Sequence, residues 1–556
     1  MTEFSSGRIS FSLGSPKRDP EADRARLRAI HDRLRAQDLA GATEMAEAAL
    51  AQGLEHPMLF NLAADRLERE DRFEEALALL QRGHDFAPQD LGLRQALGLN
   101  LHRLEHYASA LIHFDAVVAA HPDIAPAHAA RGATLEAMGD IRGAAAAYGR
   151  AVELDPQNLA ALCGLASLAS RHGRHAEARV LAGQVLTRQS NYPDAVMILG
   201  QADLAEGRLA EGEARLRDLI SDPRANLIQQ ALAEGLLGDV LDAKDRVPEA
   251  FAAYSACNAS LIEGYRARFG IGHRILSYAQ ETAAAVARAP AATWAAEAGP
   301  LGAGATGHAF LLGFPRSGTT LLEQVLASHP GVETLEERDT LADATAIYGR
   351  PEALANLATA SPAELSRLRE AYWRRVEREG AHPTGKLFVD KHPLKTLRLP
   401  LIAKLFPDAR ILLARRDPRD VILSCFRRRF GMNAAMYELL TLEGAAGFYD
   451  AAMQLGERLG KDFALASLVV RHESLVENFD GVAREVCAFL DLPFTEAMRD
   501  FSEQIHQRGV ATPSAAQLAR GLNPEGIGVW RRYADQMAPV LPALRPWVEQ
   551  FGYAAD

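Results

Sequence analysis

Cysteine is scarce in this sequence, with four residues in 556 and no C-x-x-C pair among them. Isolated thiols give neither the paired framework of a disulfide-rich protein nor the ligand spacing of a zinc site, and they fit a reducing compartment. The four are Cys163, Cys257, Cys425 and Cys487. We therefore expect neither a structural disulfide nor a metal site.

Long apolar runs are missing as well. No stretch approaches the ~18 uninterrupted apolar residues that mark a membrane span, and residues 1–20 have no apolar core of a signal peptide. The formal net charge of -11 argues against the broadly basic face of non-specific nucleic-acid binding, although it permits a local basic pocket. These absences predict a cytoplasmic protein with no transmembrane segment and no nucleic-acid partner.

A repeat with a step of 34 residues runs through the N-terminal half. Three residue types recur at that step, which is strong evidence because each type would recur for a different physical reason. Glycine permits a left-handed turn between two helices, alanine allows close helix packing, and proline ends a helix. The three series are Ala42, Ala76, Ala110, Ala144 and Ala178; Pro88, Pro122 and Pro156; and Gly139, Gly173 and Gly207.

This pattern resembles tetratricopeptide repeats, with about seven units and a degenerate end after Pro156. We expect a polar tail at 1–21, a helical solenoid with closing helices at 22–289, a linker at 290–307 and a second domain at 308–556. A solenoid of this kind binds a peptide or protein, or serves as a scaffold or homo-oligomer surface; both interpretations stay open.

The second domain begins with the pattern of a phosphate loop. Residues 308–313 are an apolar run, 314–320 read Phe-Pro-Arg-Ser-Gly-Thr-Thr, and 321–328 have helical periodicity. A strand, loop and helix in that order present backbone N–H groups and a helix N-terminus to an anion. Thr319 stands where a nucleotide P-loop has lysine, and Arg316 lies inside the loop instead.

The Pro-Arg-Ser-Gly-Thr-Thr motif resembles the 5′-phosphosulfate loop of sulfotransferases. The stretch 310–337 most resembles the tyrosylprotein sulfotransferase branch and its bacterial relatives. The resemblance implies that 3′-phosphoadenosine 5′-phosphosulfate (PAPS) is the sulfuryl donor. It also implies a loop that binds the 5′ end of PAPS, through Arg316, Ser317, Gly318, Thr319 and Thr320.

A second anion site is predicted where the apolar run 409–414 leads into a basic segment. Arg416 ends the strand, Ser424 lies about two turns into the next helix, and Arg428 follows four residues later. Converging arginine and hydroxyl groups bind a phosphate dianion through charge-assisted hydrogen bonds. The resemblance assigns the 3′-phosphate of PAPS to this site, and it places His472 where the family has a nucleotide-contacting tyrosine.

The resemblance also implies the reacting groups. Glu337 lies 21 residues after the loop arginine, at the offset of the family's catalytic glutamate. Lys391 matches a lysine that neutralises the bridging oxygen, and Ser514 matches a transition-state serine; Arg316 would act on the transferring charge as well. Glu336 and His392 are alternative bases.

We therefore expect an α-helical solenoid joined to an α/β, P-loop-like sulfotransferase domain with a mostly parallel sheet. Its reaction would transfer a sulfuryl group from PAPS to an acceptor hydroxyl without a metal. The leading acceptor is a protein or peptide tyrosine bound with help from the repeats, with saccharides, lipids and small molecules left open. One alternative is a P-loop phosphotransferase or NTPase, with Asp390 as the magnesium ligand; another is a repeat adaptor whose nucleotide-binding domain is not catalytic.

Overall fold

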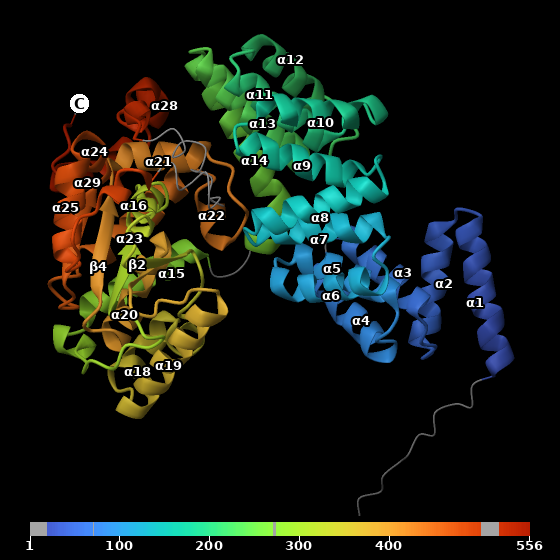
Figure 1. Ribbon diagram of the computed structural model, residues 1–556, viewed down its shortest axis with the longest axis horizontal. Helices are drawn as coiled ribbons and strands as arrows, with labels where there is room; N and C mark the ends of the chain where they lie inside the picture. Colours follow the sequence, from blue (N-terminus) through green and yellow to red (C-terminus); the bar gives the residue numbers. More distant parts are fainter. Residues whose placement is uncertain (1–18, 71, 271–273, 502–521, 556) are drawn as a thin grey trace, which may run out of the picture. The chain divides into compact units, whose positions relative to one another are not determined.

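The computed structural model describes residues 19–70, 72–270, 274–501 and 522–555. It divides into two compact units, Met1–Leu165 and Ala166–Asp556. The described part of the first unit is helical, and the second unit contains further repeat helices together with a parallel β-sheet (Figure 1).

The helices of the described repeat region are α1 (Pro20–Arg35), α2 (Leu39–Ala51), α3 (Pro57–Arg69), α4 (Phe73–Phe86), α5 (Leu91–Arg103), α6 (Tyr107–Ala120), α7 (Ala125–Ala137), α8 (Ile141–Leu154), α9 (Leu159–Arg171), α10 (His175–Arg188), α11 (Pro193–Ala205), α12 (Leu209–Ile220), α13 (Leu227–Ala243) and α14 (Val247–Phe269). Within this region, successive helices pack against each other from α1 to α8 and from α10 to α14. This confirms the helical repeat array that the 34-residue step predicts.

The turns inside the repeats have the left-handed backbone that the glycine series predicts. Gly139, Gly173 and Gly207 have φ angles of 84°, 72° and 72°. Gln37 and Glu105 lie on the same 34-residue step and also have positive φ angles, 60° and 63°. The sequence pattern missed these two turns because their residues are not glycine.

The alanine and proline series also take the expected places. The five alanines from Ala42 to Ala178 are fully buried. Pro88, Pro122 and Pro156 each lie two residues beyond the end of a helix, respectively α4, α6 and α8. The repeat pattern therefore reflects close helix packing and helix termination.

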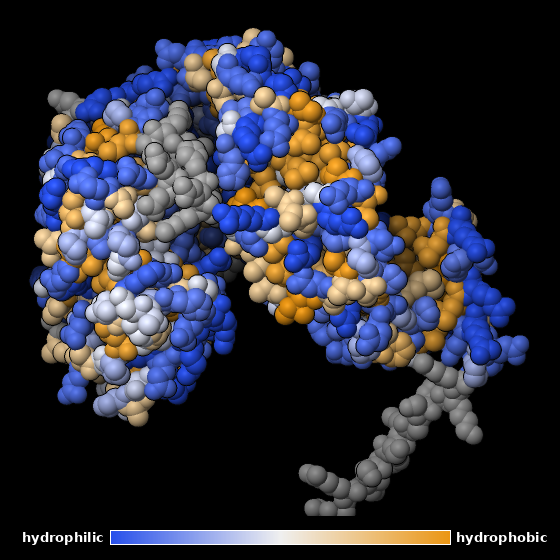
Figure 2. Space-filling view, viewed as in Figure 1, coloured by the Kyte–Doolittle hydropathy of each residue, from blue (hydrophilic) through white to orange (hydrophobic). Residues whose placement is uncertain are grey.

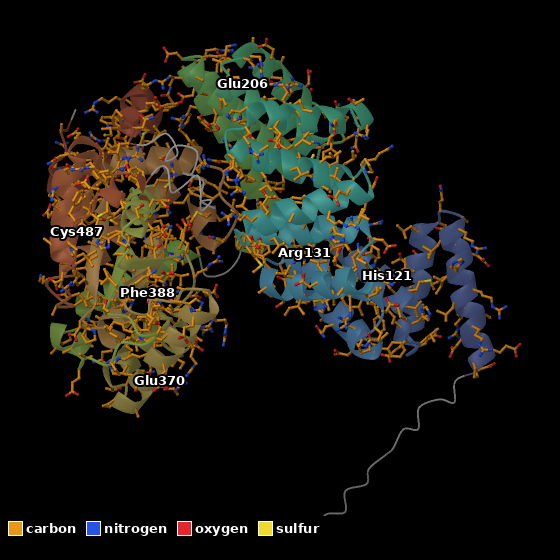
Figure 3. All side chains as sticks on the ribbon, in the orientation of Figure 1. His121, Arg131, Glu206, Glu370, Phe388 and Cys487 are labelled. Carbon is orange, nitrogen blue, oxygen red and sulfur yellow. The ribbon has the colours of Figure 1, made fainter. Side chains whose placement is uncertain are left out.

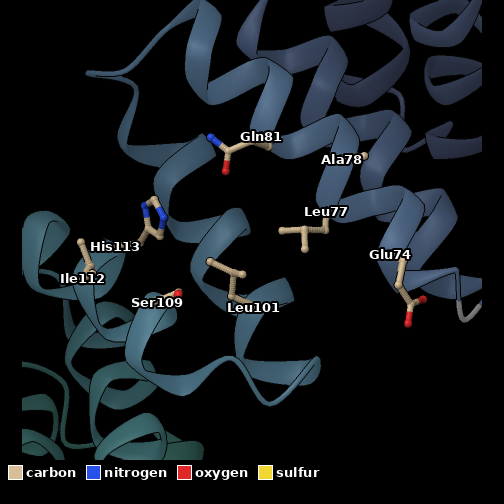
Figure 4. A pocket seen from close by; sticks show the side chains of 8 residues that line it. All are labelled: Glu74, Leu77, Ala78, Gln81, Leu101, Ser109, Ile112 and His113. Carbon is tan, nitrogen blue, oxygen red and sulfur yellow. The ribbon is translucent and has the colours of Figure 1, made fainter. Parts of the chain in front are cut away.

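A cavity of about 510 Å³ lies among α4, α5 and α6 in the first unit (Figure 4). Leu77, Leu101 and Ile112 give it an apolar lining, and Glu74 and His113 add polar groups. Ile112 is 68% exposed. Figure 2 shows apolar surface over the repeat helices.

The sheet of the second unit has five parallel strands in the order β2-β3-β1-β4-β5, which confirms the predicted parallel α/β architecture. The strands are β1 (Gly307–Leu312), β2 (Val332–Glu336), β3 (Leu387–Lys391), β4 (Arg410–Arg415) and β5 (Ser467–Arg471). Strand β2, at one edge, was not predicted.

Helices cover both faces of this sheet. Ala309 and Leu311 of β1 belong to the apolar cluster under α16 and α25, while Phe310 and Leu312 belong to the cluster on the other face. Phe388 of β3, labelled in Figure 3, is fully buried in that second cluster. Because helices cover both faces of the sheet, side chains on both sides of each central strand are buried, and these strands are therefore runs of apolar residues.

The helices around the sheet are α15 (Ile275–Arg288), α16 (Thr319–Ala327), α17 (Ala342–Tyr348), α18 (Leu354–Ala358), α19 (Pro362–Arg378), α20 (Leu399–Leu405), α21 (Pro418–Arg427), α22 (Ala434–Glu438), α23 (Leu442–Gly456), α24 (His472–Glu477), α25 (Phe479–Phe489), α28 (Ala534–Met537) and α29 (Leu541–Gln550). None of the described helices is both long and apolar enough to cross a membrane.

The segment 290–307, expected as a linker, packs onto the sheet region. Trp294 is buried at 2% exposure. The Lys404 ammonium donates to the carbonyl oxygens of Thr293 and Ala295, at 2.9 and 2.7 Å. The closing helix α15 packs against α23.

Candidate functional site

The candidate residues gather along the carboxyl edge of the parallel sheet. Glu337 follows β2, Lys391 ends β3, Gly313 follows β1, Arg416 follows β4 and His472 follows β5. Because the strands are parallel, all five ends lie at one edge, where open α/β sheets bind ligands. The candidate residues follow one another along this edge in the strand order β2-β3-β1-β4-β5, so residues that are distant in sequence lie at the ends of neighbouring strands.

The phosphate loop joins β1 to α16 through two left-handed residues, Arg316 (φ 69°) and Gly318 (φ 96°). A β-carbon on Gly318 would lie 2.8 Å from Nδ1 of His472, so only glycine fits there. The other polar residues of the loop are also buried: Ser317, Thr319 and Thr320. The loop is thus a tight backbone turn at a helix N-terminus, as the sequence predicts.

Arg316, Ser424 and Arg416 meet beside this loop. Nε of Arg316 donates to Oγ of Ser424 at 3.0 Å, and Nη1 of Arg416 donates to the carbonyl oxygen of Arg316 at 3.1 Å. Arg416 also donates to the carbonyl oxygen of Gly526. Within the described residues, the buried Nε of Arg416 and Nδ1 of His472 have no hydrogen-bond partner.

The charge balance of this cluster is positive. Burial and the neighbouring Arg416 lower the pKa of Arg316 to about 10, and burial and Arg316 lower the pKa of Arg428 to about 10. Burial, followed by the two arginines Arg416 and Arg316, lowers the pKa of His472 to about 3. The histidine is neutral at pH 7 and the arginines remain charged, so the site favours an anion.

Arg428 differs from its sequence-based interpretation in one respect. Helix α21 ends at Arg427, and Arg428 has extended backbone angles of φ -93° and ψ 129°. It therefore lies just beyond the helix rather than on the helical face of Ser424, although it remains within electrostatic reach of Arg316.

A second charged cluster surrounds Lys391, whose side chain is fully buried. Its ammonium lies 2.9 Å from carboxylate oxygens of both Glu336 and Glu337, and 3.2 Å from Glu323 of α16. Burial would lower the pKa of Lys391, but the three carboxylates raise it. Sequence reasoning missed Glu323, because only the fold brings this helix residue to the end of β3.

The three carboxylates differ in environment. Glu337 is 44% exposed, Glu336 25% and Glu323 2%. Burial raises the pKa of Glu323 to about 8 against the opposing effect of Lys391. Burial also acts on Glu337, but Lys391 outweighs it and holds the pKa of Glu337 below its usual value. Glu337 is thus ionised at neutral pH and the most accessible of the three.

His392, the alternative base, is held by the backbone. Its Nδ1 accepts a hydrogen bond from the N–H of Leu394 at 3.2 Å. Burial, and then Lys395, lower its pKa to about 4. It is therefore neutral at pH 7, and its Nδ1 already has a hydrogen-bond donor.

Asp390, the acid that a P-loop NTPase would need, is part of a buried network. Both of its oxygens accept from Lys395, at 2.5 and 2.6 Å, and Thr340 and Tyr372 donate to one of them. A carboxylate whose oxygens are filled in this way is not free to bind magnesium. This geometry weakens the NTPase interpretation.

One further sequence candidate and three neighbouring residues complete the description. Ser514 lies outside the described residues. Trp530 is buried at 5% exposure in the apolar core, with the Arg419 guanidinium 3.9 Å from its ring centroid. Arg427 and Arg429 are mostly buried and form ion pairs with Asp242 and Asp239 of α13.

Residues 309–496 match the sulfotransferase family. Among curated proteins, an uncharacterized protein of Aquifex aeolicus is 27% identical over 253 residues, covering 42% of this chain and 32% of its own. The protein-tyrosine sulfotransferase 1 of Danio rerio is 25% identical over 256 residues, covering 44% of this chain and 71% of its own. The chain thus spans about a third of the first relative.

Two solved structures are also similar over part of the chain. A tetratricopeptide repeat protein from Parabacteroides merdae has a TM-score of 0.36 at 14% identity, covering 43% of this chain and 93% of its own. The sulfotransferase domain of a Synechococcus olefin synthase has a TM-score of 0.30 at 24% identity. The similarity covers 42% of this chain and 90% of that domain's chain. The match to the sulfotransferase family thus covers residues 309–496, which include the phosphate loop and most of the parallel sheet, and described repeat helices precede it in the chain.

Proposed function

We propose that this protein transfers a sulfuryl group from PAPS to an acceptor hydroxyl. The observation that supports this most is the cluster of Arg316, Arg416 and Arg428 around Ser424, next to a loop of P-loop spacing that has no P-loop lysine. PAPS carries anionic groups at both ends of its nucleotide, and two adjacent cationic sites match that distribution.

The 5′ end would bind in the phosphate loop. Backbone N–H groups, the hydroxyls of Thr319 and Thr320 and the N-terminus of α16 all favour negative charge there. Arg316 would stabilise charge as the S–O bond breaks. The 3′-phosphate would bind Ser424, Arg428 and the Nε of Arg416, which has no partner among the described residues.

The neutral His472 would line the nucleotide site without adding to its positive charge, since burial and two arginines keep its pKa near 3. Its place against Gly318 puts it between the loop and the end of β5. A nucleobase or ribose could accept or donate a hydrogen bond at its Nδ1.

In the transfer step, the acceptor oxygen forms a bond to sulfur and the bond from sulfur to the bridging oxygen breaks. Glu337 takes the proton of the acceptor hydroxyl, because it is ionised and the most exposed carboxylate of its cluster. Lys391 would stabilise the charge left on the bridging oxygen, and Ser514 is the candidate for a serine that acts in the transition state. The products are a sulfate ester and adenosine 3′,5′-bisphosphate.

A protein or peptide tyrosine is the acceptor that we favour. Support comes from the partial likeness to a protein-tyrosine sulfotransferase and from the helical repeats, whose family commonly binds peptides. The apolar cavity among α4, α5 and α6 is one surface that could receive an apolar side chain of such a partner.

Calorimetry with adenosine 3′,5′-bisphosphate and with AMP tests the donor site, and labelled PAPS tests turnover. We expect the bisphosphate to bind more tightly than AMP. Arg428→Gln should lower bisphosphate affinity about ten- to a hundred-fold, the range for loss of a charge-assisted hydrogen bond, with little effect on AMP. Arg545→Gln, on the exposed surface of α29, is the matched control.

Glu337→Gln separates binding from chemistry in the same assays. It should retain bisphosphate binding and reduce kcat by about 10²- to 10⁴-fold, as loss of a general base does. Full turnover in this variant, together with its loss in His392→Gln, would assign the base to His392. Equal binding of bisphosphate and AMP by the unmodified protein would contradict the proposed donor.

A further inference from the structure

The chain changes direction at the end of α21, where three arginines follow one another. Arg427 is the last helical residue and Arg428 has extended backbone angles. Successive side chains of an extended segment point to opposite sides. Arg427 and Arg429 contact the repeat helix α13, whereas Arg428 lies near Arg316 of the phosphate loop.

Two aspartates of α13 hold the outer arginines. Asp242 pairs with Arg427 and Asp239 with Arg429, each at 2.5 Å. The aspartates are themselves fixed by tyrosine hydroxyls, Tyr254 donating to Asp239 at 2.9 Å and Tyr533 donating to Asp242 at 2.7 Å. Each arginine is thus bound to a carboxylate whose position is set by a further hydrogen bond.

The backbone of the same turn is also held by the last repeat. Nδ2 of Asn258, in α14, donates to the carbonyl oxygen of Phe426 at 2.9 Å in a buried contact. The final carbonyl groups of a helix have no partner within the helix, so this amide satisfies one of them. The ring of Phe251 stacks on that of Phe426, with centroids 5.2 Å apart.

The charges on the two sides of the turn differ. Burial lowers the pKa of Arg427 and Arg429, but the carboxylates and phenols of α13 and α14 outweigh it and raise both. The pKa of Arg428 is instead lowered to about 10, by burial and then by Arg316. Two of the three guanidiniums are therefore compensated by the repeat, while the middle one contributes charge to the anion site.

We propose that Asp239 and Asp242 of the last repeat are positioning residues for the 3′-phosphate site, holding the turn so that Arg428 faces Arg316 and Ser424. This inference rests on the proposed function of that site. Selectivity for a nucleotide with a 3′-phosphate then depends on residues in the repeat array that do not touch the nucleotide.

The C-terminal segment strengthens the connection. The carbonyl oxygen of Gly526 accepts a hydrogen bond from Arg416. Arg532, in the short 3-10 helix Val529–Tyr533, pairs with both Asp242 and Asp245 of the repeat. The segment therefore contacts the donor site at one end and the last repeat at the other.

Binding of adenosine 3′,5′-bisphosphate and of AMP to the full chain tests this proposal. Asp239→Asn and Asp242→Asn should each lower bisphosphate affinity about tenfold, within the range for residues that act through a neighbour, and change AMP affinity less than about threefold. Glu213→Gln is the matched control. Among the described residues, the ion pairs of Glu213 are with Arg217, Lys244 and Arg246 rather than with the arginine turn.

Asp239→Glu keeps the charge and should recover part of the lost affinity, which a general folding defect would not show. Asn258→Leu provides an independent variant, since it removes the hydrogen bond to Phe426 without changing a charge. Affinity equal to the unmodified protein, or equal loss for both nucleotides, would overturn the positioning role. If the unmodified chain does not prefer the bisphosphate over AMP, the proposed function fails instead.

Discussion

At the scale of single residues, the cluster around Lys391 shows how the fold prepares a charged group. One ammonium is surrounded by three carboxylates, which would leave a net negative charge if all were ionised. Burial raises the pKa of Glu323 to about 8 and so opposes its ionisation, against the effect of Lys391. The buried Lys391 thus keeps its place while the accessible Glu337 remains ionised.

Protonation of His472 should make folding stability depend on pH. Its pKa is about 3 in the folded chain and ordinarily about 6.5 in an unfolded one, so the unfolded state binds more protons between these values. The free energy of unfolding therefore has its full value, as far as His472 is concerned, above pH 6.5, and it decreases as the pH falls from 6.5 towards 3. At pH 5.5 the loss is about 1.4 kcal/mol.

Urea titrations of the unmodified protein and of His472→Gln at pH 7.5 and 5.5 measure this loss. The variant should lose less stability than the unmodified protein between the two pH values, by about the amount above. An equal decrease in both proteins would show that His472 is not excluded from protonation in the folded state.

At the scale of elements, the repeats show that backbone geometry is kept where residue type is not. Gln37 and Glu105 adopt the left-handed turn that glycine adopts in three later repeats. A β-carbon makes this conformation unfavourable by roughly 1–2 kcal/mol, partly offset by the greater entropy of glycine in the unfolded chain. These turns are therefore places where the repeat array is less stable than it could be.

Glu105→Gly should stabilise the first unit by about 1 kcal/mol, because the exposed turn at φ 63° then has no β-carbon. A thermal melt would show this as an increase in Tm of roughly 2–4 °C. Glu105→Ala keeps the β-carbon and is the control. A similar increase in both variants would assign the effect to the glutamate side chain rather than to the backbone.

The elements also show which parts of the site the sequence could predict. The phosphate loop, the end of β4 and the helix after β4 are local patterns, and all were expected. Strand β2 was not, because its five residues include two glutamates and its pairing with β3 depends on residues 55 positions away. Glu323 and the aspartates of α13 were missed for the same reason, since only tertiary contacts give them partners.

At the scale of the molecule, the boundary between the two compact units lies elsewhere than the boundary that the composition of the sequence suggests. The later repeats belong to the same unit as the sheet, and the ion pairs of Asp239 and Asp242 lie inside that unit. The composition predicts a linker between domains at 290–307, because alanine and glycine are frequent there. Packing of Trp294 and of the helix α15 against the sheet region is not visible in composition.

Two truncated chains should therefore behave differently. Residues 157–556 retain α9 to α14 and should bind adenosine 3′,5′-bisphosphate as the full chain does. Residues 308–556 lack the last repeat and should bind it more weakly or fail to fold, because the arginine turn loses its partners. Calorimetry and circular dichroism on both chains check this, and full affinity in the shorter one would show that the repeats are dispensable for the donor site.

The strand order also sets a length scale for ligands. Neighbouring strands of a sheet are spaced by about 4.8 Å, so the four steps from β2 to β5 separate the Glu337 end from the His472 end by about 19 Å. A molecule that joins an acceptor mimic to a nucleotide with a rigid spacer would have to match that span. Spacer length would thus decide which two-headed inhibitors occupy both halves of the edge at once.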